Sequence, residues 1–210
     1  MTRKGPSAVL TLSSVAWLAF ATLGMSSCQK ATASGPPIAN KAALEPDHIP
    51  FDQCRLELAG SSFRANLKVT ESGDTIRIDL VAAGEVLETE KYSSSDTAFS
   101  VIEAGGETYN PPIPIIRYPM HIGDTWNWTG IIDTGGEVHP TKATVSTSSQ
   151  DLTIKGGIVH NVVRIDIMLS IDSGRPSNPA TRKMTFWIAP DMGVVKRAFG
   201  DYSSREPLEG

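Results

Sequence analysis

Val163–Ile171, with the sequence VRIDIMLSI, is the stretch that decides the fold. Apolar side chains occupy every odd-numbered position, and the even-numbered positions hold Arg164, Asp166, Met168 and Ser170. A period of two places alternate side chains on opposite faces of a β-strand. A face made only of Val, Ile and Leu is typical of a strand in the middle of a core sheet. The stretch therefore predicts a buried central strand.

The same alternation recurs upstream of this strand. Phe63–Thr70 has apolar residues at its odd-numbered positions, Glu71–Asp74 carries turn residues, and Ile76–Leu80 resumes the pattern. These residues predict an antiparallel hairpin. Val86–Tyr92 alternates less clearly. Its Glu and Lys residues indicate a weak strand that has one solvent-exposed face or lies at the edge of the sheet.

A second hairpin is predicted downstream. In Arg182–Ile188 the residues Met184, Phe186 and Ile188 share a face, and Pro190–Gly193 suits a four-residue turn before Val194–Tyr202. Pro111, Pro112 and Pro114 exclude their segment from a central strand, so we expect it to cross the surface or run along an edge.

Together these patterns predict an all-β domain from Phe51 to about Tyr202, because no stretch keeps helical periodicity across three turns. We expect a single antiparallel, strongly curved sheet or an open half-barrel of about 8–11 strands, with little helix. Residues 203–210 are predicted to be a C-terminal tail.

The N-terminus indicates export. Arg3 and Lys4 precede an apolar run that is too short for a membrane-spanning helix, and the run ends in Met25-Ser26-Ser27-Cys28. Small residues before a cysteine resemble the bacterial lipoprotein signal. The resemblance implies that residues 1–27 are removed and that Cys28 carries acyl chains. It also implies the periplasmic side of the outer membrane, because Gln29 rather than Asp follows the cysteine.

An ordinary secretory cut is the alternative. Ala31-Thr32-Ala33 is an A-x-A site, and cleavage there would remove Cys28 and leave a soluble exported protein. Residues 28–50 are rich in proline and small polar residues, which predicts a flexible tether. Such a coil spans about 25 Å and would hold the domain clear of lipid headgroups.

Charge and cysteine content limit the partners. The formal net charge is −4, and loss of residues 1–27 removes two bases and no acid, which makes it −6. A mildly acidic surface argues against binding to nucleic acid and against electrostatic docking on anionic lipid, so we expect membrane attachment through acyl chains alone. Cys54 is expected to be a small buried hydrophobe rather than a nucleophile.

Two segments resemble a pattern of uncharacterised exported bacterial proteins: Tyr118–Trp126, YPMHIGDTW, and Thr185–Lys196, TFWIAPDMGVVK. The pattern is an aromatic residue and a proline, then G-D-x-W, a pair of strands, and a late W-[YI]-A-P-x-x-G-[LV]-V-K hairpin. Those families look related to the periplasmic lipoprotein carrier and its outer-membrane receptor. The resemblance covers about the last ninety residues and implies a curved half-barrel able to hold acyl chains.

Catalytic and metal-binding residues show no recognisable spacing. The four histidines, His48, His121, His139 and His160, form no metal motif, and no nucleophile elbow is present. We therefore predict no catalytic site, no metal and no cofactor. A hydrolase stays open as an alternative, in which His121 or His139 meets a buried carboxylate in space.

Aromatic residues give the one candidate binding site. Tyr118, Trp126, Trp128 and Trp187 lie in or next to the segments that carry the resemblance, and Phe186 and Trp187 must face opposite ways on a strand. One interpretation is that Trp126, Trp128 and Phe186 form the centre of the core. The other is that a concave face of the sheet exposes Tyr118, Trp126, Trp128 and Trp187 to a lipid tail or another apolar ligand.

The sequence thus favours a non-enzymatic, lipid-anchored envelope protein that binds a hydrophobic ligand or another envelope component. The envelope hydrolase is one alternative. A structural or adhesive β module with an exposed edge, such as Val86–Tyr92, is the other.

Overall fold

The structure is a computed structural model that describes residues 52–154, 157–174, 179–190, 192–200 and 202–208. The chain divides into two units, Met1–Thr32 and Ala33–Gly210, and all described residues belong to the second. The predicted signal peptide, Cys28 and the tether lie outside the described residues.

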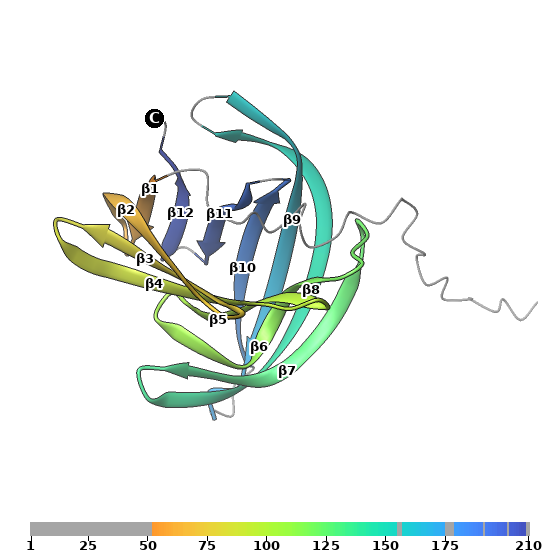
Figure 1. Cartoon of the computed structure of the whole chain (residues 1–210). Coiled ribbons are helices and arrows are strands. Elements are labelled where there is room, and N and C mark those ends of the chain that lie inside the picture. The colour runs from red at the N-terminus through yellow and green to blue at the C-terminus, as the bar shows by residue number, and fades with distance from the viewer. Residues whose placement is uncertain (1–51, 155–156, 175–178, 191, 201, 209–210) are drawn as a thin grey trace, which may run out of the picture. The chain divides into compact units, whose positions relative to one another are not determined.

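Twelve strands run through the described residues and pair with one another in antiparallel fashion (Figure 1). They are β1 (Gln53–Leu58), β2 (Ser61–Ser72), β3 (Thr75–Ala82), β4 (Glu85–Ser94), β5 (Ala98–Ala104), β6 (Glu107–Arg117), β7 (Thr125–Thr134), β8 (Glu137–Ile154), β9 (Gly157–Ile171), β10 (Ala180–Ala189), β11 (Gly193–Phe199) and β12 (Ser203–Pro207). Within these residues no helix is long and apolar enough to cross a membrane.

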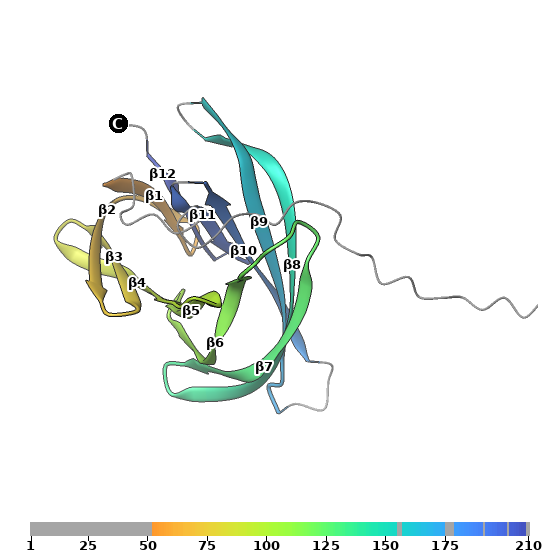
Figure 2. The same cartoon turned by 45° about the vertical axis from the view of Figure 1, so that its right-hand side comes forward.

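The strands close into a barrel in which sequence neighbours are also neighbours in space (Figure 2). Closure is made by β1, where Leu56 lies opposite Phe63 of β2 on one side and opposite Arg205 of β12 on the other. The prediction of an all-β antiparallel fold is confirmed. The predicted open half-barrel of about 8–11 strands is wrong, because the sheet is closed and has twelve strands.

The additional closing strand comes from the segment predicted to be a tail. Ser203–Pro207 forms β12 and fills the place between β1 and β11. Its buried positions are Ser203, Arg205 and Pro207, so the period-two pattern of apolar residues that marks other strands is missing here. The β domain therefore extends past Tyr202.

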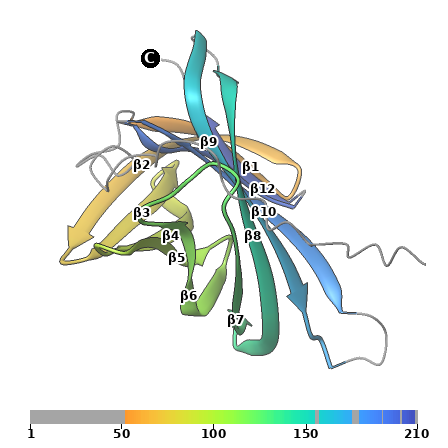
Figure 3. The same cartoon turned by 90° about the vertical axis from the view of Figure 1, so that its right-hand side faces the viewer.

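The predicted central strand lies inside β9. Val163, Ile165, Ile167 and Leu169 are at most 1% exposed, and β9 pairs with β8 and β10. The hairpin of β8 and β9 is the longest in the barrel and extends beyond β10 (Figure 3). Both predicted hairpins are also confirmed: β2 pairs with β3, and β10 pairs with β11.

Strand β4 differs from its prediction. It pairs with β3 along most of its length and with β5 from Lys91 to Ser94. Glu88 and Glu90, for which the sequence predicts a solvent-exposed face or an edge, are buried on the inner side of the strand. Charged residues can face the interior here because arginines of β11 and β12 meet them there.

Candidate functional site

Trp126 and Trp128 lie on the inner face of β7 and belong to the core. Their indole N–H groups donate to the carbonyl oxygens of Pro114 and Pro111, over 3.0 and 3.1 Å. Beyond Asn110, β6 and β7 are not paired by a backbone ladder. Prolines cannot donate to such a ladder, so the two indoles supply hydrogen bonds across a seam that the prolines leave open.

Gly130 makes room for one of these indoles. A Cβ atom at this position would lie 2.4 Å from the Trp128 ring and 2.5 Å from the carbonyl oxygen of Asn110. The ring therefore packs over the bare Cα of a residue two positions along its own strand, and the seam has no space for a larger side chain.

The other predicted ligand-binding residues lie elsewhere. Tyr118 is partly buried against the core. Trp187 is on the outer face of β10, with the guanidinium of Arg164 at 5.7 Å and the ammonium of Lys196 at 5.5 Å from its ring centroid. Phe186 points to the interior, which confirms that the two neighbours face opposite ways. The four residues thus do not line one site, and their role in ligand binding stays a prediction.

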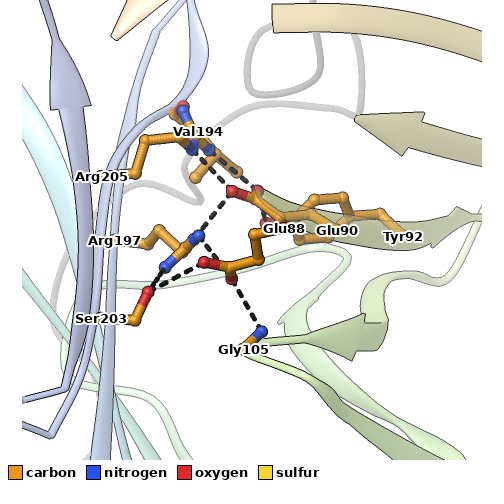
Figure 4. A network of polar contacts seen from close by, with 8 residues as sticks. All are labelled: Glu88, Glu90, Tyr92, Gly105, Val194, Arg197, Ser203 and Arg205. Atoms are coloured by element: carbon orange, nitrogen blue, oxygen red, sulfur yellow. Dashed lines mark hydrogen bonds and ion pairs between the residues drawn. The ribbon is translucent and has the colours of Figure 1, made fainter. Parts of the chain in front are cut away.

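Inside the barrel lies an ion network that the sequence did not indicate (Figure 4). Arg205 donates through Nε to Glu90 Oε1 over 2.7 Å and through Nη2 to Glu90 Oε2 over 3.1 Å. Arg197 donates to the same Glu90 oxygen, Oε1, and to Glu88 Oε1, over 2.8 and 2.6 Å. Four charged side chains, two of each sign, are thereby joined across the interior.

Neutral groups complete the network. Tyr92 Oη donates to Glu90 Oε2 over 2.6 Å, and the N–H of Gly105 donates to Glu88 Oε1 over 2.8 Å. Ser203 Oγ accepts from Arg197 and donates to Glu88 Oε2. Each carboxylate oxygen of Glu88 and Glu90 thus accepts at least one hydrogen bond, which is the condition for burying an ion pair at tolerable cost.

The network fixes the protonation of its members. Burial acts to raise the pKa of Glu90, but the charges of Arg205 and Arg197 outweigh it and hold that pKa at about 2. Burial lowers the pKa of Arg197, yet Glu90 and Glu88 leave it above its usual value. Burial also raises the pKa of the nearby Cys54 thiol to about 11. Cys54 is therefore a buried core residue, as expected, and its thiol is held in the protonated form.

A second ion pair lies between β6 and β10. The guanidinium of Arg182 donates through both terminal nitrogens to the carboxylate of Glu107, with Nη1 and Oε1 2.6 Å apart. Tyr109 and Thr134 also donate to this carboxylate, and the Tyr202 ring lies under the guanidinium. The inside of the barrel is thus occupied by packed apolar side chains and two sets of paired charges.

Among the described residues, neither His121 nor His139 meets a buried carboxylate, which the hydrolase alternative required. His121 Nδ1 lies 3.6 Å from Asp124, and His139 Nε2 lies 3.8 Å from the exposed Glu137. The carbonyl of His121 accepts from Thr147, which is eight residues from His139 along β8, or about 26 Å of strand. In the described part of the chain, no three His, Cys, Asp or Glu side chains converge as metal ligands would.

A groove crosses the outer face of β7, β8 and β9, and we call it the β7–β9 groove. It consists of two adjoining hollows of about 380 and 420 Å³ that share Thr129, Lys142 and Ser170. Further outward side chains in its lining are Asn127, Thr144, Met168, Asp172, Pro140 and Pro179. Hollows of this size are typical of small-ligand sites, in which a few polar groups are set among apolar surface.

Sequence reasoning named one residue of the lining, Trp128, and missed the rest of the groove, because the groove depends on the register of three strands. Asn127 lies opposite Thr144, and Thr144 lies opposite Met168; the next row is Thr129, Lys142 and Ser170. The available signal was the outward face of residues 125–129 and 142–148, which carries Thr, Ser, Asn and Lys at alternate positions. That pattern alone does not distinguish a binding surface from a solvated one.

Comparison with known proteins gives limited information. No model of a known protein family matches the sequence, and no curated protein matches it. A protein from Bacteroides fragilis, described as a "putative exported protein with YmcC-like fold", is 13% identical, with a TM-score of 0.46 over 79% of this chain and 97% of that one. The hypothetical lipoprotein YmcC from Escherichia coli is 13% identical, with a TM-score of 0.42 over 77% of this chain and 88% of that one. At these values neither likeness assigns a function to this chain.

Proposed function

We propose that this protein is a non-enzymatic, lipid-anchored protein of the cell envelope that binds another envelope component in the β7–β9 groove. The observation that carries the proposal is the contrast between the two sides of the barrel wall. The inner side is filled by side chains such as Phe186, Phe199, Arg197 and Arg205, none of which is exposed. The outer side carries two adjoining hollows with polar side chains directed into them.

The predicted hydrophobic ligand has less support from this arrangement. An acyl chain inside the barrel would have to displace packed core residues, and each lost contact would cost folding free energy. Binding of an apolar fluorescent probe to the purified protein tests this version. Saturable uptake would favour a ligand inside the barrel, whereas no uptake is the result that the groove proposal expects.

The location of the protein is proposed from its N-terminus. Acyl chains on Cys28 would hold the domain at the periplasmic side of the outer membrane, with residues 29–50 as the tether. The intact mass of protein extracted from membranes tests this part. A mature chain that begins at Cys28 and carries the added mass of acyl chains is expected, and a chain that begins at Ser34 would contradict the anchor.

Crosslinking in living cells tests the binding function itself. A photo-reactive amino acid replaces Met168, which is 47% exposed in the groove, and in a matched control it replaces Val86, which is 55% exposed on β4. We expect an adduct of defined size at position 168 that is missing at position 86. Absence of any adduct at position 168, or identical adducts at both positions, would contradict binding in the groove.

A further inference from the structure

We infer that the component bound in the β7–β9 groove is a neutral, hydroxyl-rich saccharide chain, an inference that rests on the proposed function. The groove is a regular grid of side chains. Asn127, Thr144 and Met168 form one row across the three strands, and Thr129, Lys142 and Ser170 form the next. Rows are about 7 Å apart along the strands, and neighbours within a row are about 4.8 Å apart.

The hydrogen-bonding capacity of this grid is largely unused. Thr144 Oγ1 donates to Asn127 Oδ1 over 3.2 Å. Within the described ranges, the side chains of Thr129, Lys142 and Ser170 have no hydrogen-bond or ion-pair partner in the protein. Hydroxyl and amide groups both donate and accept, so the grid offers mixed donors and acceptors at short intervals. Sugar hydroxyls have the same dual character and match such a surface.

The charge of the groove excludes strongly charged ligands. Its lining has one base, Lys142, and one acid, Asp172, and no arginine. Binding of phosphate or of a polyanion relies on arginine pairs or on clusters of bases. A cationic ligand would need an excess of carboxylates. The balance of one positive and one negative group fits a ligand without net charge.

The form of the groove favours a saccharide over a peptide. A peptide that adds to a sheet needs a free strand edge, whereas the groove lies on the face of three strands that are already paired. An amphipathic helix needs an apolar groove, whereas Thr129, Lys142 and Ser170 place two hydroxyls and an ammonium in both hollows of this one. Met168, Pro140 and Pro179 supply apolar contact, which suits the C–H face of a sugar ring. The two hollows adjoin, which suits a chain rather than a single sugar.

The test measures binding of the purified full-length protein, in detergent, to chitin oligosaccharides as the neutral probe and to heparin as the anionic probe. The double variant Thr129→Val/Thr144→Val removes two hydroxyls with little change in shape. Thr70→Val removes an exposed hydroxyl from β2 and is the matched control. We expect the double variant to bind the chitin probe about tenfold more weakly or worse, since two hydrogen bonds are lost, while the control binds like the wild type.

The outcomes separate this inference from the proposed function. Failure of the wild type to bind the chitin probe, equal binding by variant and control, or tighter binding to heparin would each overturn the saccharide inference. In cells, an adduct at position 168 that is degraded by glycan-cleaving enzymes would support it. A protease-sensitive protein adduct there would overturn it and leave the proposed function intact, whereas no adduct would overturn both.

Discussion

Arg205 and Glu90 form a two-pronged ion pair inside the barrel, and both side chains are 0% exposed. The partners are 115 residues apart in the sequence and lie on β12 and β4. Arg197 of β11 donates to the same glutamate. The pair thus joins β12 to β4 across the interior. Because both charges are fully desolvated, the strength of the pair rests on its close geometry.

Replacement of Arg205 by methionine is therefore expected to destabilise the protein strongly. It would leave a glutamate in the interior with one arginine partner fewer, and breaking a buried pair typically costs about 3–5 kcal/mol. Urea unfolding followed by tryptophan fluorescence measures the change. The control is Arg55→Met, which breaks the Arg55–Glu206 pair at the surface, where both side chains are at least 35% exposed and solvent screening leaves about 1 kcal/mol or less. Equal costs for the two variants would contradict the buried pairing.

The same network makes stability depend on acid. The pKa of Glu90 is about 2 in the folded protein and 4.5 without the fold. Between these values the unfolded chain binds more protons, so the free energy of unfolding is highest above pH 4.5 and falls as the pH approaches 2. The loss from this group is on the order of 3 kcal/mol.

Urea unfolding at a series of pH values measures this acid dependence. Glu90→Gln should show a flatter acid limb than the wild type, because the substituted residue no longer titrates. Glu103→Gln, which removes a partly exposed carboxylate paired with Lys91, is the matched control, because solvent screening limits what an exposed pair contributes. A Glu90→Gln variant with an unchanged slope would show that this carboxyl is not the group responsible.

The sequence was sufficient where apolar alternation and burial agree. Residues 163–171 are the clear case, since their odd positions from 163 to 169 are buried in β9 and Ile171 at the end of the strand is half-buried. Prediction from the sequence failed where the interior of the barrel is polar. Glu88 and Glu90 look like surface residues by any local rule, and their arginine partners are 107–115 residues away. The inward positions of β12 are also mainly polar, so the sequence did not predict this strand. Without β12 the predicted sheet was open, whereas the observed sheet is closed.

The aromatic residues show a second limit of sequence reasoning. A period of two placed Trp126 and Trp128 on one face, but it could not say what their indole N–H groups would meet. Their acceptors are prolines 12 and 17 residues upstream. Most of the lining of the β7–β9 groove could not be predicted for a similar reason, because it depends on how β7, β8 and β9 align.

Cys54 is expected to resist thiol reagents in the folded protein. Its side chain is buried, and burial raises its pKa to about 11, so little thiolate is present at pH 8. Reaction with an aromatic disulfide reagent, followed by absorbance, should be slow in buffer and fast in concentrated urea. Acylation would block the sulfur of Cys28, so Cys54 should be the single thiol that reacts. Rapid reaction in buffer would show that β1 opens readily or that the thiol is exposed.

Trp128→Phe tests the hydrogen bonds across the seam between β6 and β7. The phenyl ring keeps most of the buried apolar surface but cannot donate to the carbonyl of Pro111, which would be left without this partner in the interior. A lost buried hydrogen bond of this kind costs about 1–3 kcal/mol.

Trp187→Phe is the matched control, since Trp187 Nε1 is buried and has no hydrogen-bond partner among the described residues. The control is expected to lose less stability or even gain some, because it removes an unpaired buried N–H. Urea midpoints of both variants, measured under the same conditions, give the comparison. If Trp187→Phe lowers stability as much as Trp128→Phe, ring volume and not the indole N–H holds the seam together.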